Sequence, residues 1–174
     1  MTEQSKAKLA NIELLVLDVD GVLTNGSLLI NADGSESKCF NTLDGHGIRM
    51  WKRAALKVAF LSGRDSAPTK HRARQLEIDY CLQDCHNKLP ALEQLVEQMG
   101  ISLKAAAYIG DDLPDLPAMR AAGFSAAVAN AVDEVKHAAD YVTACQGGCG
   151  AVREVIEYIL KSTGRWQQVT ERYF

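Results

Sequence analysis

Asp18 and Asp20 are the residues whose type and spacing point most directly to chemistry. They stand two residues apart, directly after the short apolar run 14–17. An aspartate can attack phosphorus to form an aspartyl-phosphate, while a second carboxylate protonates the leaving oxygen and later activates water. The two carboxylates must then differ in proton affinity, which their surroundings set. By itself the pair has an alternative, because an aspartate after a strand is often a turn or cap residue. Together with the polar groups that follow the other strands, it predicts covalent phosphoryl transfer.

More polar groups follow other apolar runs. Asp111 and Asp112 come after the run 105–109, with Asp115 close behind. Ligands bind at the carboxyl ends of parallel strands, so we expect these carboxylates to meet Asp18. Carboxylates crowded together repel one another unless a cation lies among them, and Mg²⁺ prefers carboxylate, water and phosphate oxygens. The sequence therefore predicts a magnesium site that Asp111 completes, with Asp112 and Asp115 in support.

Three residues at the same predicted edge suit a phosphorylated, acidic substrate. Ser62 and Arg64 flank Gly63 after the run 57–61, and Lys88 follows a later turn. A serine hydroxyl can donate a hydrogen bond to a phosphoryl oxygen, and a lysine supplies a point charge to the phosphate and the nucleophile. The Arg64 guanidinium can hold a carboxylate with two hydrogen bonds, although it could also lie on the surface.

Two further segments are weaker candidates for substrate contact. Asp44 and His46 lie in a glycine-flanked turn before a predicted helix, where helix capping is the alternative. Gly147 to Gly150 precede another predicted helix, and glycines there can present backbone N–H groups to an anion. Loop flexibility is the alternative for this segment, in which Gly148 is the candidate binding residue.

The elements that must position these groups alternate along the chain. Continuous apolar runs at 14–17, 57–61 and 105–109 predict strands buried on both faces, and weaker runs lie at 124–129, 141–143 and 78–82. Helical patterns occupy 47–55, 67–76, 89–99, 116–122, 132–138 and 151–160. This alternation predicts an α/β three-layer sandwich with a mostly parallel sheet.

One segment interrupts the alternation. The strand-like runs 27–30 and 36–40 flank Asp33-Gly34, a combination typical of a β-hairpin. Because the segment 27–40 directly follows the first strand, we interpret it as a flap over the strand-end site. The alternative is a loop without a role.

Length, composition and charge limit the classes of protein to which this chain can belong. The chain has 174 residues, of which 47% are hydrophobic and 24% charged, with a net charge of −3. This indicates one globular domain over 1–174, and gives no reason to expect binding to nucleic acid or an anionic membrane. The polar start, residues 1–10, lacks the apolar core of a signal peptide, so we expect a cytoplasmic protein with its five cysteines reduced.

The ordered motifs resemble those of the haloacid dehalogenase superfamily of phosphatases, over nearly the whole chain. The matching segments are 18–22, 61–64, Lys88 and 110–112. The resemblance implies a Rossmann-like core with Asp18 as nucleophile and Asp20 as general acid and base. It also implies Ser62 and Lys88 as phosphate-binding groups. Mg²⁺ would be held by Asp18, Asp111 and the backbone carbonyl of Asp20.

Segments 18–26, 44–48 and 147–154 are similar to one branch, the 3-deoxy-D-manno-octulosonate 8-phosphate phosphatases. That family is capless and tetrameric, with hairpins packed between subunits, and makes a sugar acid for bacterial lipopolysaccharide. Cys149 stands where many of these enzymes carry a basic residue. A phosphatase for nine-carbon, sialic-acid-like 9-phosphates therefore remains an alternative. So does a non-catalytic, phosphatase-like accessory domain of a sugar-activating system.

Chain length also bears on assembly. No gap between the predicted elements can hold a cap domain, so a lone core would leave the site open to water. We expect neighbouring copies to supply the missing cover, which predicts a symmetric oligomer, with a tetramer as the resemblance implies. The hairpin and the aromatic C-terminal tail, residues 164–174, are the expected sources. A free, disordered tail is the alternative.

Overall fold

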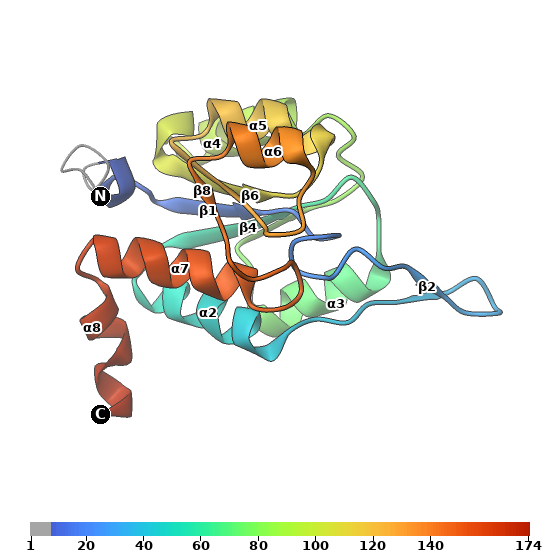
Figure 1. The fold of residues 1–174 in the computed structure, drawn as a ribbon, viewed down its shortest axis with the longest axis horizontal. Coiled ribbons are helices and arrows are strands. Elements are labelled where there is room, and N and C mark those ends of the chain that lie inside the picture. Colours follow the sequence, from blue (N-terminus) through green and yellow to red (C-terminus); the bar gives the residue numbers. More distant parts are fainter. Residues whose placement is uncertain (1–7) are drawn as a thin grey trace.

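A six-stranded parallel sheet forms the centre of the computed structural model, which describes residues 8–174 (Figure 1). The strand order is β5-β4-β1-β6-β7-β8, and every neighbouring pair is parallel. The strands are β1 (Leu14–Leu17), β4 (Lys57–Leu61), β5 (Tyr80–Leu82), β6 (Ala106–Gly110), β7 (Phe124–Ala127) and β8 (Tyr141–Val142). The predicted α/β class with a mostly parallel sheet is confirmed.

Helices cover both faces of the sheet (Figure 1). One layer contains α4 (Lys88–Met99), α5 (Leu116–Ala121) and α6 (Asp133–Ala138). The opposite layer contains α2 (Thr42–Arg53), α3 (Ala67–Leu76) and α7 (Ala151–Ser162). Short 3₁₀ turns, η1 (Leu103–Ala105) and η2 (Leu113–Asp115), lie before and after β6, and α8 (Trp166–Thr170) and η3 (Glu171–Tyr173) end the chain.

Strands β1 and β4 match their predicted bounds, and β6 is shifted by one residue from the predicted 105–109, because these central strands are buried on both faces. All residues of β1 are buried, and Val16 lies between Ala59 of β4 and Tyr108 of β6. A strand so enclosed reads as a continuous apolar run with clear ends. The outer strands β5, β7 and β8 are shorter than predicted, since the apolar runs continue into turns beyond the hydrogen-bonded ladder.

Helix α2 begins earlier than predicted. It starts at Thr42, and Asn41 is its N-cap, with Oδ1 accepting a hydrogen bond from the Leu43 N–H. The prediction began at Gly47 because two glycines made the preceding stretch look like a turn. Gly47 instead lets α2 pack closely on α7, since a Cβ there would lie 3.0 Å from Cδ of Arg153.

The predicted hairpin is present and projects beyond the carboxyl edge of the sheet (Figure 1). It pairs β2 (Leu29–Ile30) with β3 (Glu36–Ser37) in antiparallel register, so its strands are shorter than predicted. No segment of residues 8–174 forms a cap domain over this edge. Within the same residues, no helix is long and apolar enough to cross a membrane. The expectation that the polar start, residues 1–10, is not a signal peptide stays a prediction, because residues 1–7 lie outside the described residues.

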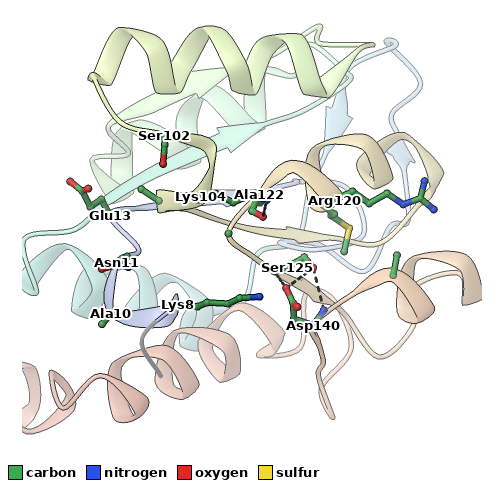
Figure 2. Close-up of a pocket in the computed structure, with 14 residues that line it drawn as sticks. Lys8, Ala10, Asn11, Glu13, Ser102, Lys104, Arg120, Ala122, Ser125 and Asp140 are labelled. Atoms are coloured by element: carbon green, nitrogen blue, oxygen red, sulfur yellow. Dashed lines mark hydrogen bonds between the residues drawn. The ribbon is translucent and has the colours of Figure 1, made fainter. Parts of the chain in front are cut away.

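A cavity of about 920 Å³ opens at the opposite, amino-terminal edge of the sheet (Figure 2). Two of its lining side chains, Asp140 and Lys104, are hydrogen-bonded to neighbouring residues. Asp140 accepts hydrogen bonds from the backbone N–H and hydroxyl of Ser125, and Nζ of Lys104 donates to the carbonyls of Ala121 and Ala122. The chemistry-bearing residues lie at the other edge, which follows the rule for open α/β sheets.

Candidate active site

Carboxylates from two adjacent strands meet at the carboxyl edge of the sheet. Asp18 follows β1, and Asp111 follows its sheet neighbour β6. Oxygen atoms of Asp18, Asp111 and Asp115 all lie within 4.8 Å of one another. The structure thus brings Asp18 and Asp111 together, as the strand-end rule predicts.

Asp115 is buried behind this pair and acts as an anchor. Its Oδ1 accepts hydrogen bonds from Nζ of Lys88 and the hydroxyl of Tyr108, at 2.6 and 2.8 Å. Its Oδ2 accepts from the backbone N–H groups of Asp111 and Asp112. Four donors fill the acceptor positions of a carboxylate. Asp115 therefore fixes its neighbours, and leaves Asp18 and Asp111 to face a ligand.

Asp112 lies outside the carboxylate cluster. Its side chain is exposed, and Oδ1 accepts a hydrogen bond from the Leu113 N–H. Asp112 and Asp115 form a reciprocal capping box around η2. The prediction named both aspartates in support of the metal, but the structure gives Asp112 a capping role and brings only Asp115 to the cluster.

Lys88 lies between two buried carboxylates. It is the first residue of α4, and its Nζ is 2.7 Å from Asp18 Oδ1 and 2.6 Å from Asp115 Oδ1. Only 6% of its side chain is exposed. Burial alone would lower the pKa of Lys88, but the two carboxylates outweigh it and raise the pKa. Lys88 is therefore held as a cation against the predicted nucleophile.

One ammonium does not balance three carboxylates. Burial, followed by the charge of Asp115, raises the pKa of Asp18 to about 6, against the opposing effect of Lys88. Burial and the charges of Asp18 and Asp115 raise the pKa of Asp111 to about 8. This excess negative charge fits a hard divalent cation, and the oxygen donors of Asp18 and Asp111 suit Mg²⁺.

Gly21 allows the turn after β1 to approach Asp111. Its φ of +100° belongs to the left-handed region, and a Cβ there would lie 2.0 Å from Asp111 Oδ2. Thr24 secures the turn, because its Oγ1 accepts hydrogen bonds from the N–H groups of Gly21 and Gly26. The Asp-x-Asp-Gly motif therefore has a conformational requirement as well as a chemical one.

The Asp20 carboxylate is turned toward a lysine of the hairpin. Nζ of Lys38 lies 2.5 Å from Oδ1 and 2.7 Å from Oδ2 of Asp20. Sequence reasoning missed Lys38, although it stands two residues after Glu36 at the end of the predicted flap. That alternation of charges is the signal that could have indicated it.

Ser62 and Arg64 share a tight turn at the end of β4, with Gly63 between them. The Ser62 hydroxyl is buried, donates to the Arg64 carbonyl and accepts from the Arg64 N–H. The Arg64 guanidinium donates from Nη2 to Oε2 of Glu36, at 2.9 Å. Both residues thus lie in one turn at the predicted edge, and their roles toward a substrate stay predictions.

Asp44 lies inside α2, not before a helix, and is buried. Its carboxylate accepts hydrogen bonds from the backbone N–H groups of Gly150 and Arg153, at the start of α7. The capping alternative is therefore the one observed, although Asp44 caps a different helix from its own. Burial raises the pKa of Asp44 against these hydrogen bonds.

His46 also lies inside α2 and contacts the C-terminal tail. Its Nε2 is 2.9 Å from the Tyr173 hydroxyl, and its Nδ1 is 3.3 Å from Nη1 of Arg153. Burial and the charges of Arg153, Arg53 and Arg49 lower the pKa of His46. Tyr173 accepts a further hydrogen bond from Arg53, so the tail binds α2 of its own subunit.

The glycine-rich loop before α7 uses its N–H groups internally. These groups in residues 147–150 donate to Oδ1 of Asn130, the carbonyls of Val22 and Gln146, and the carboxylate of Asp44. The predicted presentation of free N–H groups to an anion is therefore wrong. The loop instead packs on the turn after β1, so proximity of Gly148 to a substrate stays a prediction.

Comparison with known proteins identifies the family of this chain. Residues 82–156 match the family model described as haloacid dehalogenase-like hydrolase. The 3-deoxy-D-manno-octulosonate 8-phosphate phosphatase of Escherichia coli K12 is 43% identical over 159 residues, which is 91% of this chain and 85% of that protein.

Solved structures extend the comparison. That phosphatase from Moraxella catarrhalis, in complex with magnesium, phosphate and KDO, is 39% identical, with a TM-score of 0.96 over 100% of both chains. The cobalt-bound Haemophilus influenzae enzyme is 44% identical, with a TM-score of 0.87 over 90% of this chain and 92% of that one. This chain therefore belongs to the 3-deoxy-D-manno-octulosonate 8-phosphate phosphatase family, within the haloacid dehalogenase-like hydrolases.

Proposed function

We propose that this chain is a Mg²⁺-dependent phosphomonoesterase that hydrolyses 3-deoxy-D-manno-octulosonate 8-phosphate. One observation carries the proposal: Lys88 pairs with Asp18 inside a buried cluster of carboxylates at the strand ends. This arrangement suits a carboxylate nucleophile held beside a dianionic phosphate. The name of the E. coli relative and the magnesium, phosphate and KDO of the Moraxella complex support the substrate.

The mechanism assigns one role to each group. The Asp18 carboxylate attacks phosphorus and forms an aspartyl-phosphate. Asp20 protonates the leaving sugar oxygen, then takes a proton from the water that hydrolyses the intermediate. Mg²⁺, held by Asp18, Asp111 and the backbone carbonyl of Asp20, would offset negative charge on the phosphoryl group. Lys88 adds a second positive charge, and its bond to Asp115 keeps it in place.

The remaining site residues would bind the substrate. Ser62 and Gly63 lie where a turn can contact the phosphate, and Arg64 can pair with the carboxylate of a keto-sugar acid. Gly148 lies in the loop packed on the turn after β1. The alternative substrate is a nine-carbon keto-sugar-acid 9-phosphate, because Cys149 stands where many octulosonate phosphatases carry a basic residue. Asp44 and His46 would act only indirectly, through α7 and the tail.

We further infer where the enzyme acts and how it assembles. The enzyme would act in the cytoplasm, on an intermediate of lipopolysaccharide sugar biosynthesis. Residues 8–174 form one domain, with the hairpin 27–40 as a flap and 164–174 as a tail. The domain would assemble as an oligomer, because the hairpin leaves the apolar side chains of Leu28, Leu29 and Ile30 uncovered. The family resemblance implies that the oligomer is a homotetramer.

Phosphate release tests the proposal. Eight- and nine-carbon keto-acid phosphates and hexose phosphates are compared with Mg²⁺ and with EDTA. We expect Mg²⁺-dependent release, fastest with the octulosonate. Asp18→Asn should lower kcat on the order of 10³-fold or more, because the nucleophile is lost. Asp133→Asn, at an exposed position of α6, is the matched control.

Each alternative has its own outcome. Full turnover by Asp18→Asn would refute the mechanism, and a clear preference for hexose phosphates would refute the substrate class. Faster release from the nine-carbon phosphate would favour the sialic-acid-like alternative. Retained Mg²⁺ binding without turnover of any ester would favour the non-catalytic accessory domain.

A further inference from the structure

The returning strand of the hairpin carries two opposite charges toward the site. Glu36 begins β3 and Lys38 directly follows it, so the two residues are two positions apart. Residues at this spacing lie on the same face of an extended chain. Both make ion pairs with residues of the active-site edge, Glu36 with Arg64 and Lys38 with Asp20.

Lys38 holds both oxygens of one carboxylate. Its Nζ lies 2.5 and 2.7 Å from Oδ1 and Oδ2 of Asp20, and 1% of the Lys38 side chain is exposed. An ammonium centred between the two oxygens restricts rotation of the carboxylate about its last bond. The ion pair is shielded from water, so it is stronger than an exposed pair.

Glu36 binds one nitrogen of the Arg64 guanidinium, and another nitrogen of the same group has no protein partner in residues 8–174. Its Oε2 accepts from Nη2 of Arg64, while Nη1 of Arg64 is buried and has no hydrogen-bond partner in residues 8–174. The Ser66 hydroxyl, then the charges of Lys38 and Arg64, lower the pKa of Glu36, so it remains ionised near neutral pH. A buried, unpartnered donor is costly, and a ligand acceptor would satisfy it.

The two ion pairs connect segments that are far apart in the sequence. Asp20 lies in the turn after β1, and Arg64 lies in the turn after β4. We propose that Glu36 and Lys38 are positioning residues, with Lys38 orienting the ionised Asp20 carboxylate for the second step, in which it takes a proton from water, and Glu36 orienting Arg64 toward the carboxylate of the substrate. This inference rests on the proposed function, because it uses the roles assigned there to Asp20 and Arg64.

The two residues should affect different kinetic constants. Lys38 acts on the group that transfers protons, so its loss should lower kcat and leave KM nearly unchanged. Glu36 acts on the group that binds the substrate carboxylate, so its loss should raise KM and leave kcat nearly unchanged. If Glu36 and Lys38 only stabilised the fold, their loss would not affect kcat and KM separately in this way.

The experiment compares Lys38→Met, Lys38→Arg and Glu36→Gln with the unmodified enzyme. The substrates are 3-deoxy-D-manno-octulosonate 8-phosphate and p-nitrophenyl phosphate, which has no carboxylate. Lys57→Met is the control for the lysine, since Lys57 pairs with Asp79 on the surface. Glu157→Gln, which removes an ion-paired glutamate of α7, is the control for the glutamate. Thermal unfolding reports whether each variant folds.

We expect Lys38→Met to lower kcat by about 10–100-fold, the usual cost of losing a group that orients a site residue. Lys38→Arg, which keeps the charge and donors, should restore most of this loss. Glu36→Gln should raise KM several-fold for the octulosonate and leave both constants unchanged for p-nitrophenyl phosphate. The two control variants should match the unmodified enzyme.

Other results would overturn the inference. These are a kcat of Lys38→Met equal to or above that of Lys57→Met, no recovery in a folded Lys38→Arg protein, and equal effects of Glu36→Gln on both substrates. Failure of the proposed function is distinguishable. If another ester is preferred, Lys38→Met should still lower kcat on p-nitrophenyl phosphate, because Asp20 must still activate water in the second step.

Discussion

At the residue scale, the acidic cluster divides into carboxylates that are saturated and carboxylates that are not. Asp115 receives four donors, whereas Asp18 shares one ammonium with it and Asp111 has no cation of its own within residues 8–174. The strand-end rule correctly predicted that Asp18 and Asp111 lie close together. It could not choose between Asp112 and Asp115, because that choice depends on how the 3₁₀ turn η2 directs each side chain.

Two residues of the site region were not predictable from their own positions. Tyr108 reads as one apolar residue of a buried strand, yet its hydroxyl donates to Asp115. From the sequence pattern, Lys38 would be a solvent-facing residue of a flap, yet its side chain is buried against Asp20. Local patterns report the element a residue belongs to, while these partners lie elsewhere in the sequence.

The metal-free enzyme should lose stability as the pH rises from about 4 to 8. The pKa values of Asp18 and Asp111 are raised to about 6 and about 8, from 3.8. In this window the folded state binds protons that the unfolded state has released, so the free energy of unfolding falls with pH. The lowered pKa of His46 acts in the opposite direction and offsets part of this loss around its usual pKa of 6.5, whereas the raised pKa of Lys88 acts only above this window. Added Mg²⁺ should reverse the loss, increasingly at higher pH.

Thermal unfolding in EDTA and in Mg²⁺, across this pH range, measures the effect. Asp111→Asn removes the carboxylate with the higher pKa, so it should flatten the pH dependence in EDTA and weaken the response to Mg²⁺. Asp133→Asn, at the exposed start of α6, should change neither. A melting temperature in EDTA that rises between pH 5 and 8 would contradict the expected sign.

At the element scale, the strands were easier to predict than the loops between them. The bounds of β1 and β4 follow from continuous apolar runs, because helices cover both faces of the sheet. The prediction that the glycine-rich loop, residues 147–150, presents free N–H groups to an anion was wrong, because its sequence resembles that of an anion-binding helix start. Its N–H groups find partners in Asn130, Val22 and Asp44, which are distant in the sequence.

That loop and the turn after β1 are in backbone contact, which predicts the effect of Gly147→Ala. A Cβ at Gly147 would lie 1.6 Å from the Gly21 carbonyl oxygen, so one backbone must move. We expect a loss of about 1–3 kcal/mol in stability, typical of overpacking, together with a lower kcat because Asp18 and Asp20 precede the displaced turn. Activity assays and thermal unfolding measure both.

Gly100→Ala is the control for this variant. Gly100 has a left-handed φ of +69°, and a Cβ there would meet nothing within 4 Å. That substitution should cost stability through its backbone conformation alone and leave kcat unchanged. If Gly147→Ala behaved in the same way, the contact between the loop and the turn would have no part in catalysis.

At the scale of the whole molecule, chain length predicted a single core without a cap and an oligomer in which neighbouring copies cover the site. The alternation of strands and helices predicted the α/β class. The course of the tail was not predictable, since Tyr173 finds His46 and Arg53 more than 100 residues away. The hairpin bears more directly on assembly. Leu28, Leu29 and Ile30 are adjacent and are 50%, 61% and 57% exposed.

A hairpin of this kind needs a partner surface. Its strands are two residues long, and a two-stranded ribbon is only marginally stable in water on its own. Covering three adjacent apolar side chains in another copy would stabilise the hairpin and, through Glu36 and Lys38, the site beneath it. The family resemblance implies four copies, so light scattering after gel filtration should give about four times the chain mass of 19.0 kDa.

Charge placed on strand β2 of the hairpin tests this dependence. The double substitution Leu29→Lys and Ile30→Lys should lower the measured mass and, with it, kcat/KM, because burying two ammonium groups in an apolar interface is strongly unfavourable. Val132→Lys, at another exposed apolar position, should leave both unchanged. A fully active species near 19.0 kDa would show instead that one subunit shields its own phosphate site. The flap would then act without a neighbour.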